Sequence, residues 1–135
     1  MDDVLVNKIA IIKNCISRVN EEYDNNIDNL ELNYTKQDSI ILNLQRACEA
    51  AIDIGTRICC LHSLGIPQSS REVFQMLEKA KYISSALSQH LQHMVGFRNI
   101  AVHEYQKINL DVVRNILEHR LDDFRLFTEC IKKTI

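Results

Sequence analysis

Glycine and proline are scarce in this chain, and that scarcity limits the possible folds more than any other feature of the sequence. The 135 residues include only three glycines and one proline. An all-β fold needs many tight turns, and tight turns depend on these two residue types. Long helices need few of either. We therefore predict an all-α protein, and the length suits a single domain over residues 1–135 with one core.

Apolar side chains recur at helical spacing along most of the chain. In the first predicted helix they form one face, spaced three and four residues apart: Leu5, Ile9, Ile12, Ile16, Val19 and Tyr23. The polar stretch 24–29 is predicted to be a loop. A second long helix follows, with a capping pattern Thr35-x-x-Asp38 and an apolar stripe over 40–58. Small side chains such as Gly55 dominate the middle of this stripe, which allows a neighbouring helix to approach closely.

Capping and stop signals separate three further helices. These signals are Gly65 and Pro67 as a stop, Ser69-x-x-Glu72 as a capping box, Ser84 or Ser85 as a cap, and Asn109 or Asp111 at the start of the last helix. They predict a short helix over 71–81, a long helix after 84, and a closing helix with an apolar stripe over 110–131. Short connections favour an up-and-down bundle of four main helices and one short helix.

The composition argues against several classes of protein. A net charge of −2 gives no overall attraction to nucleic acid, so any site for a polyanion must be local. The N-terminus has no signal-like apolar run, and no apolar stretch approaches the length of a membrane span. The five cysteines form no CxxC pair and fall mostly inside apolar stripes. We therefore expect a cytoplasmic protein with buried, reduced thiols and no membrane segment.

The stretch 96–105 interrupts the apolar regularity. The stripe that runs through Leu91 and Met94 continues to Arg98, where a core side chain would be expected. His103 and Tyr105 follow a few residues later. Polar side chains on an apolar face are costly unless they are paired or face a cleft. The stretch is therefore a candidate functional site.

Helix geometry constrains how Arg98 and His103 could cooperate. Five residues apart on an ideal helix, they lie roughly 140° from each other. Either the helix ends near Ala101, or the two side chains meet across a pair of chains. An alternative without function is that Arg98 pairs with Glu49 or Asp53 of the second helix. His103 and Tyr105 would then merely end a helix. Spacing alone leaves these interpretations open.

Other clusters carry less weight. His90-x-x-His93 could place two imidazoles on adjacent turns, but no third ligand has convincing spacing, so we interpret both as solvated histidines. Cys59 and Cys60, near His62, point apart on a helix and are interpreted as buried structural thiols. The sequence has no glycine-rich phosphate loop and no nucleophile elbow of a Ser-His-Asp hydrolase. We predict no metal ligands and no cofactor.

The octapeptide Arg98-Asn99-Ile100-Ala101-Val102-His103-Glu104-Tyr105 resembles the R-x4-6-H motif of the HEPN superfamily, in the R-x4-H-x-Y form of HepT-like toxins. The resemblance extends to 38–50, 64–71 and 109–113, so it covers nearly the whole chain. It implies a HEPN-like helical bundle and the toxin of a bacterial two-gene toxin–antitoxin module. Such a toxin would be a metal-independent RNA endonuclease acting on tRNA or mRNA. Arg98 and His103 would be its catalytic residues, in a cleft between the protomers of a homodimer.

The same resemblance implies a protein partner. The antitoxin of such modules is a minimal nucleotidyltransferase of the MntA type, which silences the toxin by transferring AMP to the motif tyrosine. Tyr105 is therefore the expected site of AMPylation. A competing hypothesis is a catalytically silent HEPN module that binds a nucleotidyltransferase partner or a nucleotide, in which Arg98 would hold a phosphate or a carboxylate of the partner.

Overall fold

The computed structural model describes residues 2–135, and every regular element in this range is helical. The elements are α1 (Asp3–Tyr23), α2 (Ile27–Glu31), α3 (Tyr34–Leu61), α4 (Ser70–Lys79), α5 (Ser85–His103), a 3₁₀ helix η1 (Tyr105–Lys107), α6 (Leu110–His119) and α7 (Leu121–Thr134). The absence of strands from residues 2–135 confirms the all-α prediction.

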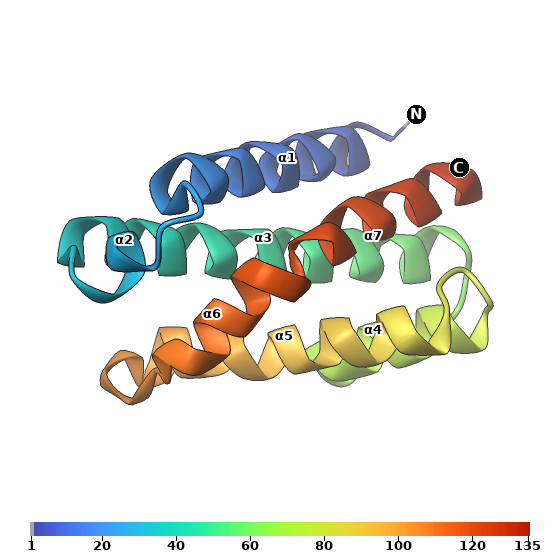
Figure 1. Ribbon diagram of the computed structural model, residues 1–135. Coiled ribbons are helices and arrows are strands. Elements are labelled where there is room, and N and C mark those ends of the chain that lie inside the picture. Colours follow the sequence, from blue (N-terminus) through green and yellow to red (C-terminus); the bar gives the residue numbers. More distant parts are fainter. Residues whose placement is uncertain (1) are drawn as a thin grey trace.

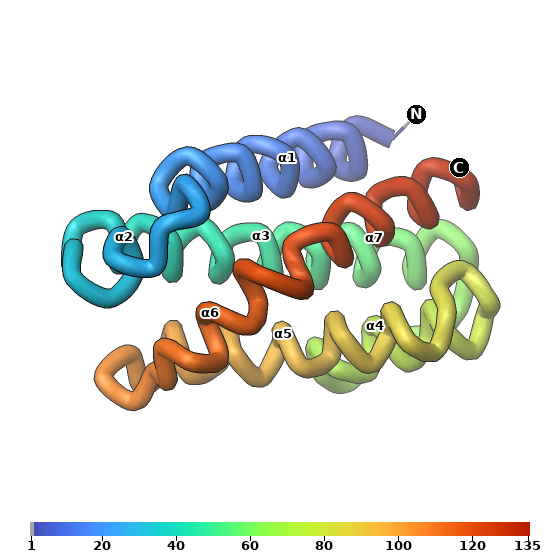
Figure 2. The backbone as a smooth tube through the Cα atoms, viewed as in Figure 1, coloured from blue at the N-terminus to red at the C-terminus, as the bar shows by residue number. Residues whose placement is uncertain are grey.

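Helix α3 is the centre of the bundle. It contacts α1, α2, α4, α5 and α7. The chain reverses direction from α1 to α3 and again from α3 to α5 (Figure 2), which confirms the predicted up-and-down arrangement. Helices α6 and α7 cross the bundle diagonally, and η1 lies at the same end as α2 and the start of α3 (Figure 1). Two distant parts of the chain, η1 and the first turns of α3, thus share one end of the molecule.

The apolar stripes predicted from spacing form the core. Every stripe residue of α1 except Ile16, which is half-buried, is buried, and α3 contributes twelve buried residues. Helix α4 packs tightly against α3 at Gly55, where an added Cβ would lie 2.3 Å from Cγ1 of Val73. The small residues in the middle of α3 therefore allow close helix packing, as predicted.

Side-chain caps define most helix starts. Ser69 Oγ accepts from the Glu72 N–H at 3.1 Å, and Ser84 Oγ accepts from the Leu87 N–H at 3.1 Å. Asn109 caps α6. These three caps were among those predicted. The cap of helix α3 is instead Asn33, whose Oδ1 accepts from the backbone N–H of the residue three positions later at 3.0 Å, so the prediction that Thr35 caps this helix was wrong.

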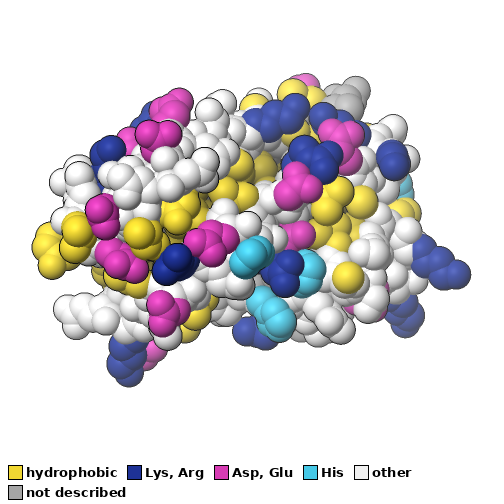
Figure 3. Space-filling view, in the orientation of Figure 1, with side chains coloured by type: hydrophobic (Ala, Val, Ile, Leu, Met, Phe, Trp, Pro, Cys, Tyr) yellow, Lys and Arg dark blue, Asp and Glu magenta, His cyan; other side chains and the backbone are white. Residues whose placement is uncertain are grey.

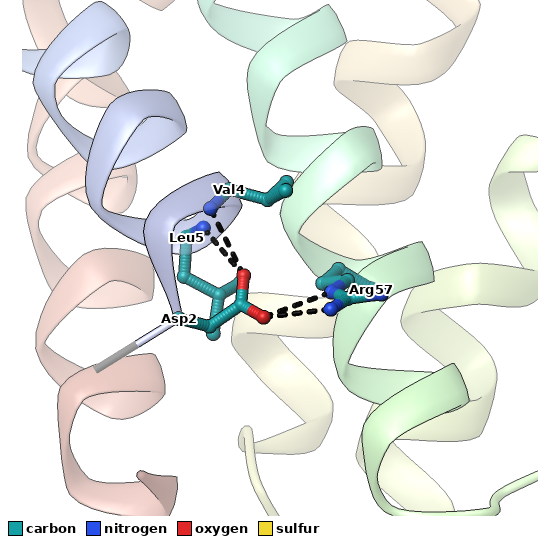
Figure 4. A network of polar contacts seen from close by, with 4 residues as sticks. All are labelled: Asp2, Val4, Leu5 and Arg57. Atoms are coloured by element: carbon teal, nitrogen blue, oxygen red, sulfur yellow. Dashed lines mark hydrogen bonds and ion pairs between the residues drawn. The ribbon is translucent and has the colours of Figure 1, made fainter.

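The cap of α1 also joins two helices (Figure 4). One carboxylate oxygen of Asp2 accepts from the backbone N–H groups of Val4 and Leu5 at 3.0 and 3.2 Å. The other oxygen accepts from Nη2 and Nε of Arg57 on α3 at 2.7 and 3.2 Å. The hydrogen bond from the Arg57 guanidinium holds the pKa of Asp2 below its usual value.

Two further element predictions were wrong. The stretch 24–29 starts as the predicted loop, with Asp24 and Asn25 at positive φ, but α2 then begins at Ile27. The predicted single closing helix is broken at Arg120 into α6 and α7. Helix α6 contacts α2, whereas α7 contacts α1, α3 and α5. The break therefore lets the two halves of one apolar stripe reach different partners.

The thiols follow the prediction in part. Cys15, Cys48 and Cys59 are buried, Cys130 is half-buried, and Cys60 is exposed, which corrects the interpretation of both vicinal cysteines as buried. Burial raises the pKa of the Cys48 thiol to about 12. None of the helices within residues 2–135 has the length and apolar character needed to cross a membrane.

Candidate active site

The candidate site lies at the C-terminal end of α5. This helix continues without a break to His103, and the N–H of its C-cap, Glu104, donates to the Ile100 carbonyl at 2.8 Å. The alternative in which the helix ends near Ala101 is therefore wrong. On a continuous helix Arg98 and His103 are separated by roughly 140°, so they point to different sides of α5.

Arg98 points towards α3. Its Nη2 lies 3.5 Å from Oε2 of Glu49, and its Nη1 donates to Oδ1 of Asn99 at 3.1 Å. Nε is buried and has no hydrogen-bond partner among residues 2–135. An unsatisfied buried donor costs about 1–3 kcal/mol. The guanidinium is therefore anchored by one long ion pair and one hydrogen bond, and its Nε–H group has no acceptor among residues 2–135.

The predicted pairing of Arg98 with α3 is thus confirmed for one of its two candidates. Glu49 is the partner, and its Oε1 also accepts from Nε2 of Gln45 at 3.0 Å. Asp53, the other candidate, pairs with Lys8 of α1 at 2.9 Å instead. This pairing does not exclude function, because 27% of the Arg98 side chain stays accessible to solvent.

His103 lies on the solvent side of α5. It is exposed, and with Tyr105 and Lys107 it lines an open hollow of about 480 Å³. Arg98 does not line this hollow. The structure therefore brings His103 and Tyr105 together and leaves Arg98 on a different side of the helix.

Tyr105 begins η1, directly after α5, and its hydroxyl donates a hydrogen bond to Oδ1 of Asp38 on α3. The tyrosine remains 42% exposed. Partial burial, together with the hydrogen bond to the Asp38 carboxylate and its negative charge, raises the pKa of the Tyr105 hydroxyl. The sequence pointed to Asp38 only as part of a capping pattern. Its place in the stretch 38–50 that resembles the HEPN family was the one signal that could have drawn attention to it.

A continuous surface joins these residues. Asp38, Leu42, Gln45 and Glu49 are spaced by four, three and four positions, so they form one face of α3. We call this surface the α3–α5 face; it consists of Asp38, Leu42, Gln45, Glu49, Arg98, Val102 and Tyr105. Leu42 and Val102 are 41% and 42% exposed. The face thus presents two exposed apolar side chains in addition to the charged Arg98.

The histidine pair of α5 behaves differently from the prediction. His93 is exposed, as expected, but Nδ1 of His90 lies 3.2 Å from Oδ2 of the buried Asp123. Figure 3 shows histidines beside a Lys or Arg side chain near the α6–α7 junction. Within residues 2–135 no group of three or more His, Cys, Asp or Glu side chains is placed to hold a metal ion. His62, near the two vicinal cysteines, shares a hydrogen bond with the Tyr82 hydroxyl at 2.9 Å.

The family model described as Ribonuclease HepT-like matches residues 12–131. This chain belongs to the HepT-like family. A HepT-like relative, the mRNA nuclease HepT of Shewanella oneidensis, is 49% identical over 132 residues, which make up 98% of each protein. The resemblance carried by the R-x4-H-x-Y stretch is thereby confirmed.

Solved structures show the same HepT-like bundle. One is a tri-AMPylated Shewanella oneidensis HEPN toxin in complex with an MNT antitoxin; it is 49% identical, with a TM-score of 0.93 and coverage of 98% of this chain and 99% of that one. Another is a toxin–antitoxin with AMP-PNP, 48% identical, with a TM-score of 0.91 and coverage of 97% and 99%. The HEPN-like fold is therefore confirmed over nearly the whole HepT-like chain.

Proposed function

We propose that this chain is the ribonuclease toxin of a bacterial toxin–antitoxin module and cleaves RNA without a metal ion. The observation that carries the proposal is the R-x4-H-x-Y spacing of Arg98, His103 and Tyr105 at an accessible helix end in a HepT-like chain. The relative at 49% identity is named an mRNA nuclease, which favours mRNA over tRNA as the substrate. The toxin would act in the cytoplasm, where its RNA substrate is found.

The residue types suit metal-independent cleavage. The 2′-hydroxyl of RNA can attack the adjacent phosphate, which leaves a cyclic phosphate and a 5′-hydroxyl. This reaction needs proton transfer and stabilisation of negative charge on the phosphorus centre. His103 would transfer the proton, a role worth roughly 10²–10⁴-fold in rate. Arg98 would offer its planar set of donors to the phosphate oxygens.

We infer that the active cleft is shared by two copies of the chain. Because α5 is continuous, one chain does not direct Arg98 and His103 at the same phosphate. A two-fold homodimer that covers the α3–α5 face and the adjoining hollow of His103 would bring two copies of each group to one cleft, so that one histidine could act as base and the other as acid. The exposed Leu42 and Val102 support this contact, because a partner would cover them.

Cleavage of total RNA by the purified protein in excess EDTA tests the proposal. The wild type should cleave and leave cyclic-phosphate ends, whereas His103→Ala and Arg98→Ala should lose roughly 10²–10⁴-fold in rate. His119→Ala is the matched control, because His119 is an exposed histidine on α6. Cleavage by His103→Ala at the wild-type rate would contradict the assignment of His103 as the proton-transfer residue. Inactive wild type, shown by intact mass to carry no AMP, would favour the silent binding module.

We further propose that a minimal nucleotidyltransferase antitoxin of the MntA type silences the toxin by transferring AMP to Tyr105. The hydroxyl of Tyr105 belongs to a side chain that is 42% exposed and lines the same hollow as His103. A similar solved structure is described as a tri-AMPylated toxin in complex with its antitoxin. AMP at this position would add negative charge and bulk beside His103, and both oppose the approach of RNA.

A further inference from the structure

The Tyr105 hydroxyl is already bound to a carboxylate in the unmodified chain. It donates its hydrogen to Oδ1 of Asp38, a residue 67 positions earlier in the sequence. The two side chains come from different elements, η1 and α3, and both are exposed. A phosphoryl donor could therefore reach the phenolic oxygen while the carboxylate holds its hydrogen.

We propose that Asp38 is the general base for AMP transfer to Tyr105. This inference rests on the proposed modification of that tyrosine. The nucleotidyltransferase would supply the nucleoside triphosphate, and the toxin would supply the group that removes the proton from its own hydroxyl. Asp38 would then be a catalytic residue of the silencing reaction, because it touches the reacting oxygen.

The step is a substitution at the α-phosphorus of the nucleoside triphosphate. The Tyr105 oxygen attacks this phosphorus, and a new oxygen–phosphorus bond forms. The bond between the α-phosphorus and the bridging oxygen breaks, and pyrophosphate leaves with the electron pair. The hydroxyl proton passes to Oδ1 of Asp38. The products are the tyrosyl AMP ester, pyrophosphate and a protonated carboxyl group, which releases its proton to water.

The hydroxyl needs such a base. A phenol is a weak nucleophile while it holds its proton, and the pKa of Tyr105 is raised above its ordinary value by burial and by Asp38. At neutral pH the tyrosine is therefore protonated, and the proton must leave as the new bond forms. A hydrogen-bonded carboxylate is placed to accept it at that moment.

The two elements hold the pair in position. The η1 turn is closed by backbone hydrogen bonds from Lys107 N–H to the Glu104 carbonyl at 2.8 Å and from Ile108 N–H to the Tyr105 carbonyl at 3.1 Å. Ile108 packs against the core. Asp38 lies in the second turn of the long helix α3. The contact is therefore set by ordered backbone on both sides.

Within the range 2–135, the neighbouring ionisable groups make no hydrogen bond to the Tyr105 hydroxyl. His103, Glu104 and Lys107 line the hollow with Tyr105. Glu104 Oε1 lies 3.6 Å from Lys107 Nζ, so this carboxylate has its own partner. Among residues 2–135, Asp38 is the carboxylate hydrogen-bonded to the phenolic oxygen. A base supplied by the antitoxin is the competing explanation, and the experiment separates the two.

The test measures the single-turnover rate of AMP transfer from ATP to the full-length toxin by its purified nucleotidyltransferase antitoxin. Intact mass follows the transfer, and the measurement is repeated across a range of pH. Asp38→Asn keeps an oxygen that can accept the Tyr105 hydrogen bond but is not basic. Its transfer rate should fall by roughly 10²–10⁴-fold at neutral pH. Because the variant also lacks the negative charge that raises the tyrosine pKa, its rate should climb steeply with pH and approach that of the wild type in alkaline solution.

Asp53→Asn is the matched control, since it makes the same change on α3 in a residue paired with Lys8 and not with Tyr105. It should accept AMP at the wild-type rate. Equal rates and parallel pH profiles for Asp38→Asn and wild type would overturn the assignment of Asp38 while leaving Tyr105 as the acceptor. Wild type that accepts no AMP, or accepts it on another residue, would overturn the proposed modification itself. Circular dichroism of each variant separates loss of folding from loss of transfer.

Discussion

Arg98 shows how the chain tolerates a charged residue where its sequence pattern calls for a core side chain. The ion pair with Glu49 holds the guanidinium against α3, but it is long, and the buried Nε has no partner among residues 2–135. Such a partly exposed ion pair adds little stability by itself, because solvent screens much of the attraction. The arrangement is better explained by a demand for positive charge at this position than by stability.

Sequence spacing located this residue but did not resolve its contacts. Glu49 and Asp53 lie one turn apart on α3, so both were candidate partners of Arg98. The packing of α1 against α3 places Lys8 beside Asp53, which leaves Glu49 as the partner of Arg98. The contact between Tyr105 and Asp38 had no spacing signal at all. It depends on how η1 folds back towards α3, which is a property of the tertiary structure.

Tyr105→Phe should produce a toxin that its antitoxin does not silence by modification. The substitution removes only the hydroxyl oxygen, so the acceptor atom is lost while the ring remains. Growth of cells that express the variant with the antitoxin should stop, and intact mass should show no AMP on the purified protein. Tyr82→Phe, which removes the hydroxyl bound to His62, is the control and should still be silenced. Neutralisation of Tyr105→Phe by the antitoxin would indicate silencing by complex formation.

At the scale of elements, the sequence predicted the starts of three helices from the side chains that cap them. These side chains are Ser69, Ser84 and Asn109. The break at Arg120 gave no such signal, because the apolar spacing continues through it and neither glycine nor proline marks it. Helix α2 was missed since five residues are too few to show a period. In both cases tertiary contacts overrode the local pattern.

The link between α1 and α3 should respond to pH through Asp2. The folded-state pKa of this carboxyl is lowered, so its contribution to stability is present above its ordinary pKa of 3.8 and is lost as pH falls through the folded-state value. Asp2→Asn keeps a good capping oxygen and removes the charge that binds Arg57. Urea unfolding of this variant should show a lower midpoint than wild type at about pH 7, and the difference should shrink in strong acid.

Asp3→Asn is the control for this experiment, because Asp3 is exposed and makes no hydrogen bond with Arg57. A difference between wild type and Asp2→Asn that stays constant down to strong acid would show that the change acts through packing or the cap and not through the charge.

At the scale of the whole molecule, the sequence predicted the bundle because its amphipathic stripes are long and its loops are short. The sequence pattern did not indicate which surface would join two copies of the chain. Leu42 and Val102 are exposed, but neither interrupts the helical spacing of its own chain. Their significance comes from position: they share the α3–α5 face with Arg98. Isolated exposed apolar residues are ordinary, and it is the position of these two on the face of Arg98 that supports the proposed contact between two copies.

Leu42→Asp should therefore disrupt both the dimer and RNA cleavage. A carboxylate buried at a two-fold contact would face its own copy or a nearby apolar side chain, at a cost that prevents association. Light scattering should give the mass of a monomer, and the rate of RNA cleavage should fall by roughly 10²-fold as the shared cleft is lost. Leu126→Asp on α7, equally exposed, is the control. A monomeric Leu42→Asp variant with full activity would contradict the two-chain cleft.

The hydrogen bond between η1 and α3 has a consequence for the silenced toxin. In the proposed AMPylated form the Tyr105 oxygen would carry no hydrogen, so Asp38 would lose the donor that it binds in the free chain. The carboxylate would then face a phosphodiester of the same charge. Repulsion between the two would push η1 away from α3, at the segment that directly follows His103. The modification would thus remove the contact that holds the segment after α5 against α3, and it would also fill the hollow beside His103.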